Sequence, residues 1–160
     1  MIKIQLNKGY VALVDDQDGD LAVFDWRVSM SQKKDTIYVQ RTEKVNGKHH
    51  TVSLHSVILE RKMGRPLEKG RLCDHRDNNG LNNQRYNLRP ATPSQNAQNQ
   101  RGKKSGLKGA YFKGGKRPWI SKIYANGESI PLGSYETELE AHQAYCDAAP
   151  FYHGEFANFG

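Results

Sequence analysis

Residues 72–99 read LCDHRDNNGLNNQRYNLRPATPSQNAQN. The first four residues are typical of a short strand, and residues 77–83 form a loop rich in Asn and Gly. A second short strand is expected over residues 87–91. Thr92 then stands at an N-cap position and Pro93 at a first helical position, which predicts a helix to about residue 101. The expected order of elements is strand, loop, strand, helix.

The polar residues of this stretch offer the parts of a site that hydrolyses a phosphodiester bond. Asp74 can bind a hard divalent cation through a carboxylate oxygen, and Asn96 can add an amide oxygen. The imidazole of His75 titrates near neutral pH and can take a proton from water. Asn87 can hold the imidazole or its loop through hydrogen bonds. Together these groups can activate water and neutralise charge on a phosphate.

The adjacency of Asp74 and His75 sets a geometric condition on this site. Neighbouring side chains on a regular strand point to opposite faces of the sheet. The two residues can therefore serve one site only if the strand twists or ends at this position, and the sequence leaves that question open.

The pattern resembles the HNH endonuclease motif of phage and intron homing endonucleases. The matching residues are His55, the run 74–83, Asn87-Leu88-Arg89 and Asn96. The resemblance implies a ββα module that grips one divalent cation, Mg²⁺ or alternatively Mn²⁺. It also implies the roles of four residues: His75 as general base, Asn87 as the middle asparagine of the catalytic set, and Asp74 and Asn96 as metal ligands.

The resemblance leaves other residues with alternative roles. His55 matches an upstream histidine that either contacts phosphate or braces the fold. Arg76, Arg85 and Arg89 either hold phosphates or pair with Asp77. The chain lacks the cysteine pairs of the zinc-stapled relatives, so no structural zinc is expected.

The segments on either side of this module complete an α+β fold class. Residues 1–53 predict a β-rich segment, with a hairpin turn at Asn46-Gly47. The acidic run 15–20 predicts a solvated turn, because it lacks the downstream Glu of a calcium loop. A short helical stripe over residues 54–61 opens the nuclease module, which extends over residues 54–101.

The C-terminal part predicts three strands and a helix after a basic linker. The linker covers residues 102–109, and strands are expected over residues 110–113, 118–125 and 129–133, with a hairpin turn at Asn126-Gly127. Thr137 and Glu140 form a capping box for the helix, which begins near residue 138. The predicted domain extends over residues 110–160.

This last segment resembles an ethylene-response-factor-type (Apetala-type) DNA-binding domain. The match lies in GLKGAYF at 106–112, Trp119, LGSY at 132–135, Glu140-Ala141 and HGEFA at 153–157. The resemblance implies a three-stranded sheet packed on one helix, with the sheet in the major groove of double-stranded DNA. Its contact positions fall on Lys113, Lys116, Arg117, Trp119 and Lys122.

Charge and composition favour a nucleic-acid partner over a small-molecule substrate. The formal net charge is +7 and the isoelectric point is about 9.4. Residues 101–123 hold eight basic and no acidic side chains, whereas residues 124–160 hold six acidic and no basic ones. A basic band of this kind with interleaved aromatic residues is typical of nucleic-acid binding.

The cysteines and the N-terminus give no sign of a secreted or membrane protein. Cys73 and Cys146 stand alone in sequence, and the N-terminus has no apolar run of the kind found in leaders or membrane spans. We therefore expect a cytoplasmic monomer, in the host cytoplasm if the gene belongs to a phage.

The sequence thus predicts a metal-dependent, sequence-preferring DNA endonuclease of the homing type. The alternative is a DNA-binding regulator whose nuclease module has decayed.

Overall fold

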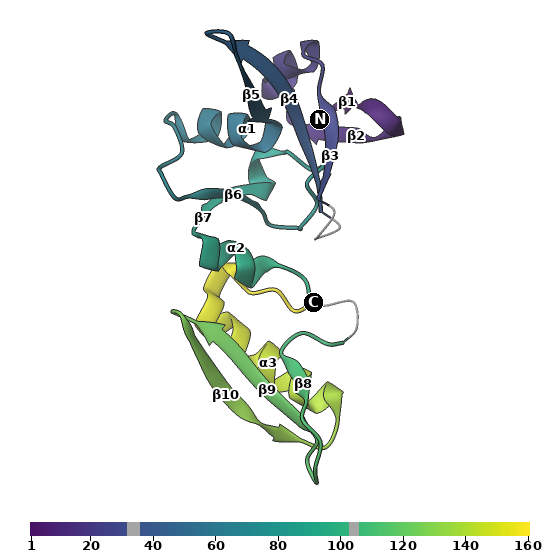
Figure 1. Ribbon diagram of the computed structural model, residues 1–160, viewed down its shortest axis with the longest axis vertical. Helices are drawn as coiled ribbons and strands as arrows, with labels where there is room; N and C mark the ends of the chain where they lie inside the picture. Colours follow the sequence, from purple (N-terminus) through teal and green to yellow (C-terminus); the bar gives the residue numbers. More distant parts are fainter. Residues whose placement is uncertain (32–35, 103–105) are drawn as a thin grey trace. The chain divides into compact units, whose positions relative to one another are not determined.

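The computed structural model describes residues 1–31, 36–102 and 106–160. They form two compact units, Met1–Ala91 and Thr92–Gly160, coloured purple to teal and green to yellow in Figure 1. Both units combine small antiparallel sheets with helices, which confirms the α+β class. The division falls after Ala91, inside the segment 54–101 that the sequence assigns to one module.

The first unit contains three small antiparallel sheets and one α-helix. Strand β1 (Ile2–Gln5) pairs with β2 (Val11–Val14), and β6 (Leu72–His75) pairs with β7 (Leu88–Ala91). The three-stranded sheet has the order β3 (Arg27–Ser31), β4 (Thr36–Val45), β5 (Lys48–Ser53). Helix α1 (Leu54–Met63) follows β5 directly, and short 3₁₀ helices cover η1 (Asn7–Gly9), η2 (Asp16–Val23) and η3 (Arg85–Asn87).

One hydrophobic core joins these sheets and α1. Its fully buried members include Val14, Val39, Ile58 and Leu88, one from each of β2, β4, α1 and β7. Trp26 belongs to the same core and is only 2% exposed. This shared core holds β6 and β7 in a fixed position against α1 and β4.

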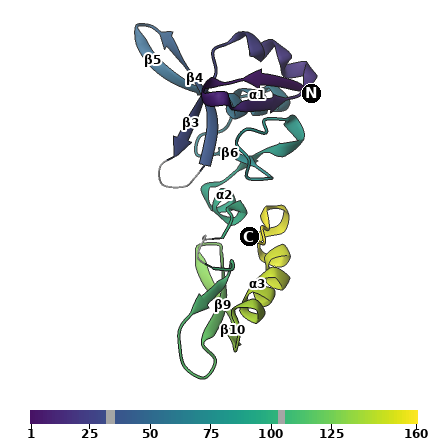
Figure 2. The same ribbon diagram turned by 90° about the vertical axis from the view of Figure 1, so that its right-hand side faces the viewer.

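The β4–β5 hairpin confirms the turn predicted at Asn46-Gly47. Both turn residues have positive φ, 50° for Asn46 and 77° for Gly47, as a two-residue turn of this twist requires. The far end of the hairpin extends beyond the rest of its unit (Figures 1 and 2).

The acidic run 15–20 is not a simple solvated turn. Its residues enter η2, and the side chain of Asp18 is completely buried. Arg85 binds Asp18 through two hydrogen bonds, Nε to Oδ2 at 2.7 Å and Nη2 to Oδ1 at 2.9 Å. The segment is therefore a structural clamp that fixes the loop before β7.

The second unit packs a three-stranded sheet against one long helix. Helix α2 (Pro93–Asn99) begins with the predicted Thr92 cap, and the sheet has the order β10 (Glu128–Tyr135), β9 (Trp119–Ala125), β8 (Ala110–Phe112). Helix α3 (Glu138–His153) covers one face of this sheet and ends in the 3₁₀ helix η4 (Gly154–Phe156) (Figure 2). The core contains Ile123, Tyr145 and Ala149.

Gly109 explains how β8 approaches α3 closely. Its φ is 81°, and a Cβ atom there would lie 2.1 Å from the ring of Tyr145. Only glycine satisfies both conditions. Residues 103–105 of the predicted linker lie outside the described residues. Within the part of the chain that the structure describes, no helix is long and apolar enough to cross a membrane.

Candidate active site

The β6–β7 hairpin determines how Asp74 and His75 are presented. Asp74 lies opposite Arg89 and His75 opposite Leu88 in the antiparallel register. Side chains alternate along a regular strand, but His75 is the last residue of β6, and the carboxylate of Asp74 lies near enough to its ring to oppose the lowering of the His75 pKa by burial. Both side chains are buried, with exposed fractions of 3% and 6%.

The imidazole of His75 packs against two other rings. The centroid of His55, on α1, lies 5.2 Å from that of His75, and the two planes meet at 80°. The centroid of Tyr38, on β4, lies 6.3 Å from His75 and 5.4 Å from His55. Three elements of the first unit thus bring three polar rings together, and we call Tyr38, His55 and His75 the ring cluster.

Asn83 determines which nitrogen of His75 carries hydrogen. The amide nitrogen of Asn83 donates to the carbonyl of Gly80 at 3.2 Å, which turns its Oδ1 toward Nε2 of His75 at 3.3 Å. An amide oxygen can only accept a hydrogen bond. Nε2 therefore carries the hydrogen, and the basic lone pair of the neutral ring lies on Nδ1.

Burial keeps both histidines of the ring cluster neutral. It lowers the pKa of His75 below the ordinary value, and the bond to Asn83 and the carboxylates of Asp77 and Asp74 oppose this shift in part. Burial, and repulsion from the His75 ring when that ring is protonated, lower the pKa of His55 to about 3. Nδ1 of His55 is buried and has no hydrogen-bond partner among the described residues.

The neutral His55 predicts a loss of stability in acid. The unfolded chain takes up a proton on this ring below about pH 6.5, whereas the folded protein resists protonation until its pKa of about 3. Between these values the unfolded state binds more protons, so the free energy of unfolding falls as the pH falls, by up to about 1.4 kcal/mol per pH unit. We expect His55→Gln to flatten this dependence between about pH 6.5 and 4.

Urea unfolding at several pH values, monitored by the fluorescence of Trp26 in a Trp119→Phe background, measures the pH dependence of the free energy of unfolding. Trp119 is in the second unit, so its removal leaves a signal from the first unit alone. Equal pH slopes with and without the His55→Gln substitution would show that another group causes the acid sensitivity.

Asp74 is bound to a buried guanidinium. Nε of Arg89 donates to Oδ2 of Asp74 at 2.8 Å, and the two side chains are 5% and 4% exposed. The sequence offered a phosphate or Asp77 as the partner of Arg89, whereas the structure pairs it with Asp74. Arg85 likewise bonds Asp18, whereas Arg76 is exposed and its backbone N–H donates to the carbonyl of Asn87 at 2.9 Å.

Asn87 holds the loop rather than the imidazole. Its amide nitrogen donates to Oδ1 of Asp77 at 2.9 Å and to the carbonyl of Asn82 at 2.8 Å, and its Oδ1 accepts from the N–H of Asp77 at 3.1 Å. Asn82 completes this network through a 2.7 Å bond to the other carboxylate oxygen of Asp77. Of the two roles that the sequence offers for Asn87, the structure displays the second.

The same loop is attached to two other elements. The N–H of Leu13 donates to the carbonyl of Leu81, and the N–H of Asn83 donates to the carbonyl of Leu13, both at 2.8 Å. Gly80 touches β4 so closely that a Cβ atom would lie 1.8 Å from the carbonyl oxygen of Ile37. The position of Asn83 beside His75 therefore depends on both β2 and β4.

Asn96 lies on α2 and belongs to the second unit. The structure thus groups Asp74, His75, Asn87 and His55 within the first unit, and places the predicted second metal ligand in the other. The described residues contain no group of three or more His, Cys, Asp or Glu side chains that could hold a metal ion.

The donors of the first unit are chemically compatible with one hard cation. A carboxylate has two oxygens and about four lone-pair directions. The bond from Arg89 to Oδ2 therefore does not by itself prevent Asp74 from binding a cation. Carboxylate oxygen is the donor that Mg²⁺ prefers. Asp74 is therefore the residue of this unit that would hold the cation.

The predicted DNA-contact residues occupy three places in the second unit. Lys113, Lys116 and Arg117 are exposed in the loop between β8 and β9. Lys122 lies on the sheet face away from α3, where its Nζ is 4.5 Å from the ring centroid of Tyr111 and 5.3 Å from that of Tyr124. Trp119 alternates along β9 with buried Ser121 and Ile123, so its side chain lies on the same sheet face as theirs. Its ring packs edge-on against that of Phe112, with the ring centroids 5.3 Å apart.

Sequence reasoning missed Tyr38, which touches the ring of His75 from β4 and carries no motif signal. Asn83 lies within the motif run 74–83, but its bond to His75 was not predicted. Arg89 is recognised as a motif residue, and its place opposite Asp74 follows from the strand pairing once the register is known.

Comparison with known proteins identifies one relationship. Over 108 residues the chain is 34% identical to Protein 3.8 of Escherichia phage T7, which covers 66% of this chain and 88% of that protein. The chain belongs to the family of Protein 3.8. No family model matches the chain. No solved structure matches it either. The name of this relative states no activity, so the function proposed below rests on the candidate site.

Proposed function

We propose that this member of the Protein 3.8 family is a metal-dependent, sequence-preferring DNA endonuclease of the HNH type. The observation that carries the proposal is the buried, neutral imidazole of His75 next in sequence to the carboxylate of Asp74. A general base must be unprotonated at the working pH, and the lowered pKa of His75 meets this requirement.

In the proposed reaction, His75 removes a proton from the attacking water. The proton moves to Nδ1, because Nε2 already carries the hydrogen that points to Asn83. The water oxygen forms a bond to phosphorus as the bond to the leaving sugar oxygen breaks, and the leaving oxygen takes a proton from solvent water. The imidazolium that results is stabilised by the nearby carboxylates of Asp77 and Asp74. A divalent cation, when bound, neutralises negative charge on the phosphate.

Arg89 and Asn87 are proposed as positioning residues, because each holds another residue of the site in place. Arg89 fixes the carboxylate of Asp74 through their buried ion pair. Asn87 fixes the loop that carries Asn83, and so holds the acceptor that orients His75. The role of Asn96, on α2 of the second unit, is a prediction from motif spacing alone.

The substrate proposed is double-stranded DNA, contacted by the basic residues of the second unit. Lys113, Lys116 and Arg117 form an exposed basic group, and Lys122 adds a charge on the open sheet face. Basic side chains of this kind contact phosphates or guanine edges. We propose the host cytoplasm as the place of action and a monomer as the active form.

Arg117→Ala and Lys122→Ala are expected to weaken DNA binding mainly at low salt. Each substitution removes one counterion-releasing contact, so the slope of log K against log salt should fall by about 0.9 per residue. Fluorescence anisotropy between about 50 and about 250 mM salt measures the slope. Slopes equal to that of the unmodified protein would place the DNA surface elsewhere.

One observation favours the second candidate, a DNA-binding regulator with a decayed nuclease module. The carboxylate proposed to hold the cation is already paired with Arg89 in a buried contact. Binding and cleavage measured side by side on the same DNA, with and without Mg²⁺ or Mn²⁺, distinguish the candidates. Metal-dependent cleavage supports the endonuclease, and tight binding without cleavage under any divalent ion supports the regulator.

A further inference from the structure

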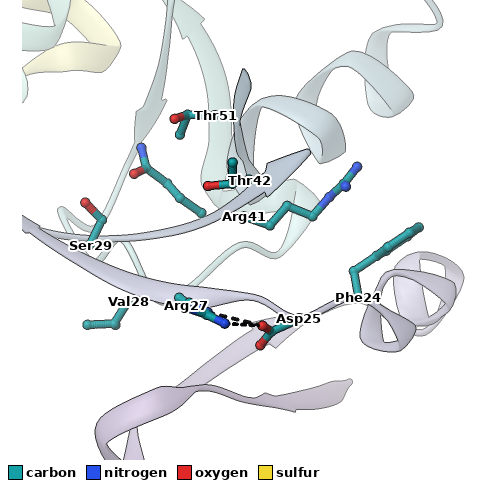
Figure 3. Close-up of a pocket in the computed structure, with 9 residues that line it drawn as sticks. Phe24, Asp25, Arg27, Val28, Ser29, Arg41, Thr42 and Thr51 are labelled. Atoms are coloured by element: carbon teal, nitrogen blue, oxygen red, sulfur yellow. Dashed lines mark hydrogen bonds and ion pairs between the residues drawn. The ribbon is translucent and has the colours of Figure 1, made fainter. Parts of the chain in front are cut away.

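The first unit contains a polar groove of about 530 Å³ that the proposed reaction does not use. Its lining comes from β3, β4 and β5 and from Phe24, just before β3 (Figure 3). The polar residues of the lining are one carboxylate, two guanidinium groups, three hydroxyls and one amide, from Asp25, Arg27, Arg41, Ser29, Thr42, Thr51 and Gln40.

The groove exists because β3 is shorter than β4. Strand β3 begins at Arg27, opposite Gln40, whereas β4 continues to Val45 with only β5 as its partner. One side of β4 is therefore uncovered from Arg41 onward. Phe24 and Arg41 close this end of the groove (Figure 3), with the guanidinium carbon of Arg41 4.5 Å from the centroid of the Phe24 ring.

The lining has the chemistry of a phosphate-contact surface. Hydroxyl, amide and guanidinium groups make most protein bonds to the DNA backbone. Nε of Arg41 is a buried donor with no partner in the described residues, and Nη2 of the same guanidinium pairs with Glu43 at 2.8 Å. Arg27 is paired with Asp25, but those side chains are 68% and 75% exposed, so the pair is weak and can exchange for a phosphate.

The face that forms the groove leads to the ring cluster. Thr42, Gln40 and Tyr38 alternate along β4 and so share one face of the sheet. Thr51 lies beside Thr42, and Ser29 beside Tyr38, on the neighbouring strands. Tyr38 contacts the rings of His55 and His75, about 13 Å along β4 from Thr42.

We propose that this groove binds the sugar-phosphate backbone of DNA and directs the strand toward His75. The inference rests on the proposed endonuclease function, which it extends by assigning a substrate-binding surface to the β-rich N-terminal segment. It makes the first unit a DNA-contact surface in its own right, separate from the basic residues of the second unit.

The test introduces negative charge into the groove and measures DNA binding. The full chain carries His75→Ala to prevent cleavage, and a labelled DNA duplex is titrated without divalent ions. We expect Thr42→Glu and Thr51→Glu each to weaken binding about tenfold, because a carboxylate repels a phosphate placed against it. Both positions are exposed, so the fold should tolerate them, and thermal unfolding checks this.

Two matched variants separate charge from other effects. Thr42→Gln has nearly the size of the glutamate variant without its charge. Gln17→Glu adds one negative charge at an exposed position of η2 that does not line the groove. Both are expected to bind DNA within about twofold of the parent.

The outcomes separate the groove from the endonuclease. If Thr42→Glu and Thr51→Glu bind like Gln17→Glu while Lys122→Ala is impaired, the groove inference is wrong and DNA binding by the second unit stands. If the parent protein binds no DNA at all, the inference and the proposed function both fail. Selective loss with the groove glutamates supports the inference, whether or not cleavage is detected in separate assays.

Discussion

His75→Ala is expected to lower the rate of DNA cleavage by about 10²–10⁴-fold, the usual contribution of a general base. The ring combines a basic nitrogen, oriented through Asn83, with a place next to Asp74. His55 is neutral too, but its pKa of about 3 makes it a poor proton acceptor. Single-turnover cleavage of end-labelled DNA at saturating protein measures the change.

A control histidine and a binding measurement complete this test. His50 is exposed on β5, away from the ring cluster, and His50→Ala should cleave at the rate of the unmodified protein. DNA affinity of His75→Ala should stay within about threefold, since the ring is buried and its proposed role is in the chemical step. Cleavage that is as fast in the His75 variant as in the His50 variant would refute the assignment of the base.

Arg85→Ala should lower the free energy of unfolding by about 3 kcal/mol. The substitution leaves the carboxylate of Asp18 fully buried without its two bonds from Arg85. Arg61 approaches Asp18 only to 3.6 Å and is engaged with Asp20 at 2.7 Å. A buried carboxylate that loses its partner costs far more than an exposed one.

Arg65→Ala is the matched control for this loss. Arg65 pairs with Glu68 at 2.6 Å, but the side chains are 60% and 57% exposed. Chemical unfolding should show a change of less than about 1 kcal/mol for that variant. Equal effects of the two arginine substitutions would mean that the Asp18 clamp does not stabilise the first unit.

Local signals in the sequence predict most elements of this fold. The strand over residues 72–75 and the Thr92 and Thr137 caps are confirmed, and so are both Asn-Gly turns. Each depends on the conformational preferences of a few neighbouring residues, which do not require knowledge of the rest of the chain.

The contacts that sequence reasoning could not predict join residues that are distant in the chain. Asp18 and Arg85 are 67 positions apart, and only the fold brings them together. Lys108 donates to the carbonyls of Gln98 and Gln100 at 2.7 and 2.6 Å, which attaches α2 to the C-terminal unit. That attachment explains why the division of the chain falls before α2, whereas sequence pattern groups α2 with the preceding strands.

In the candidate site, too, the sequence identifies residues that are close together in the chain but not the distant residues that contact them. Asp74, His75, Asn87 and Asn96 are recognisable because their spacing forms a motif. The partners that give them their chemical character, among them Tyr38, Asn83 and the opposing Arg89, are selected by strand register and by packing. Spacing alone therefore identifies candidate groups but does not establish their protonation or their pairing.

Incubation of the purified full chain with double-stranded phage-host DNA and Mg²⁺ or Mn²⁺, followed by mapping of the product ends, tests the proposed endonuclease activity most directly. We expect cleavage at preferred positions that EDTA abolishes and that the His75→Ala protein does not reproduce. DNA that is bound but stays intact with every divalent ion, or cleavage that is unaffected by EDTA, would contradict it.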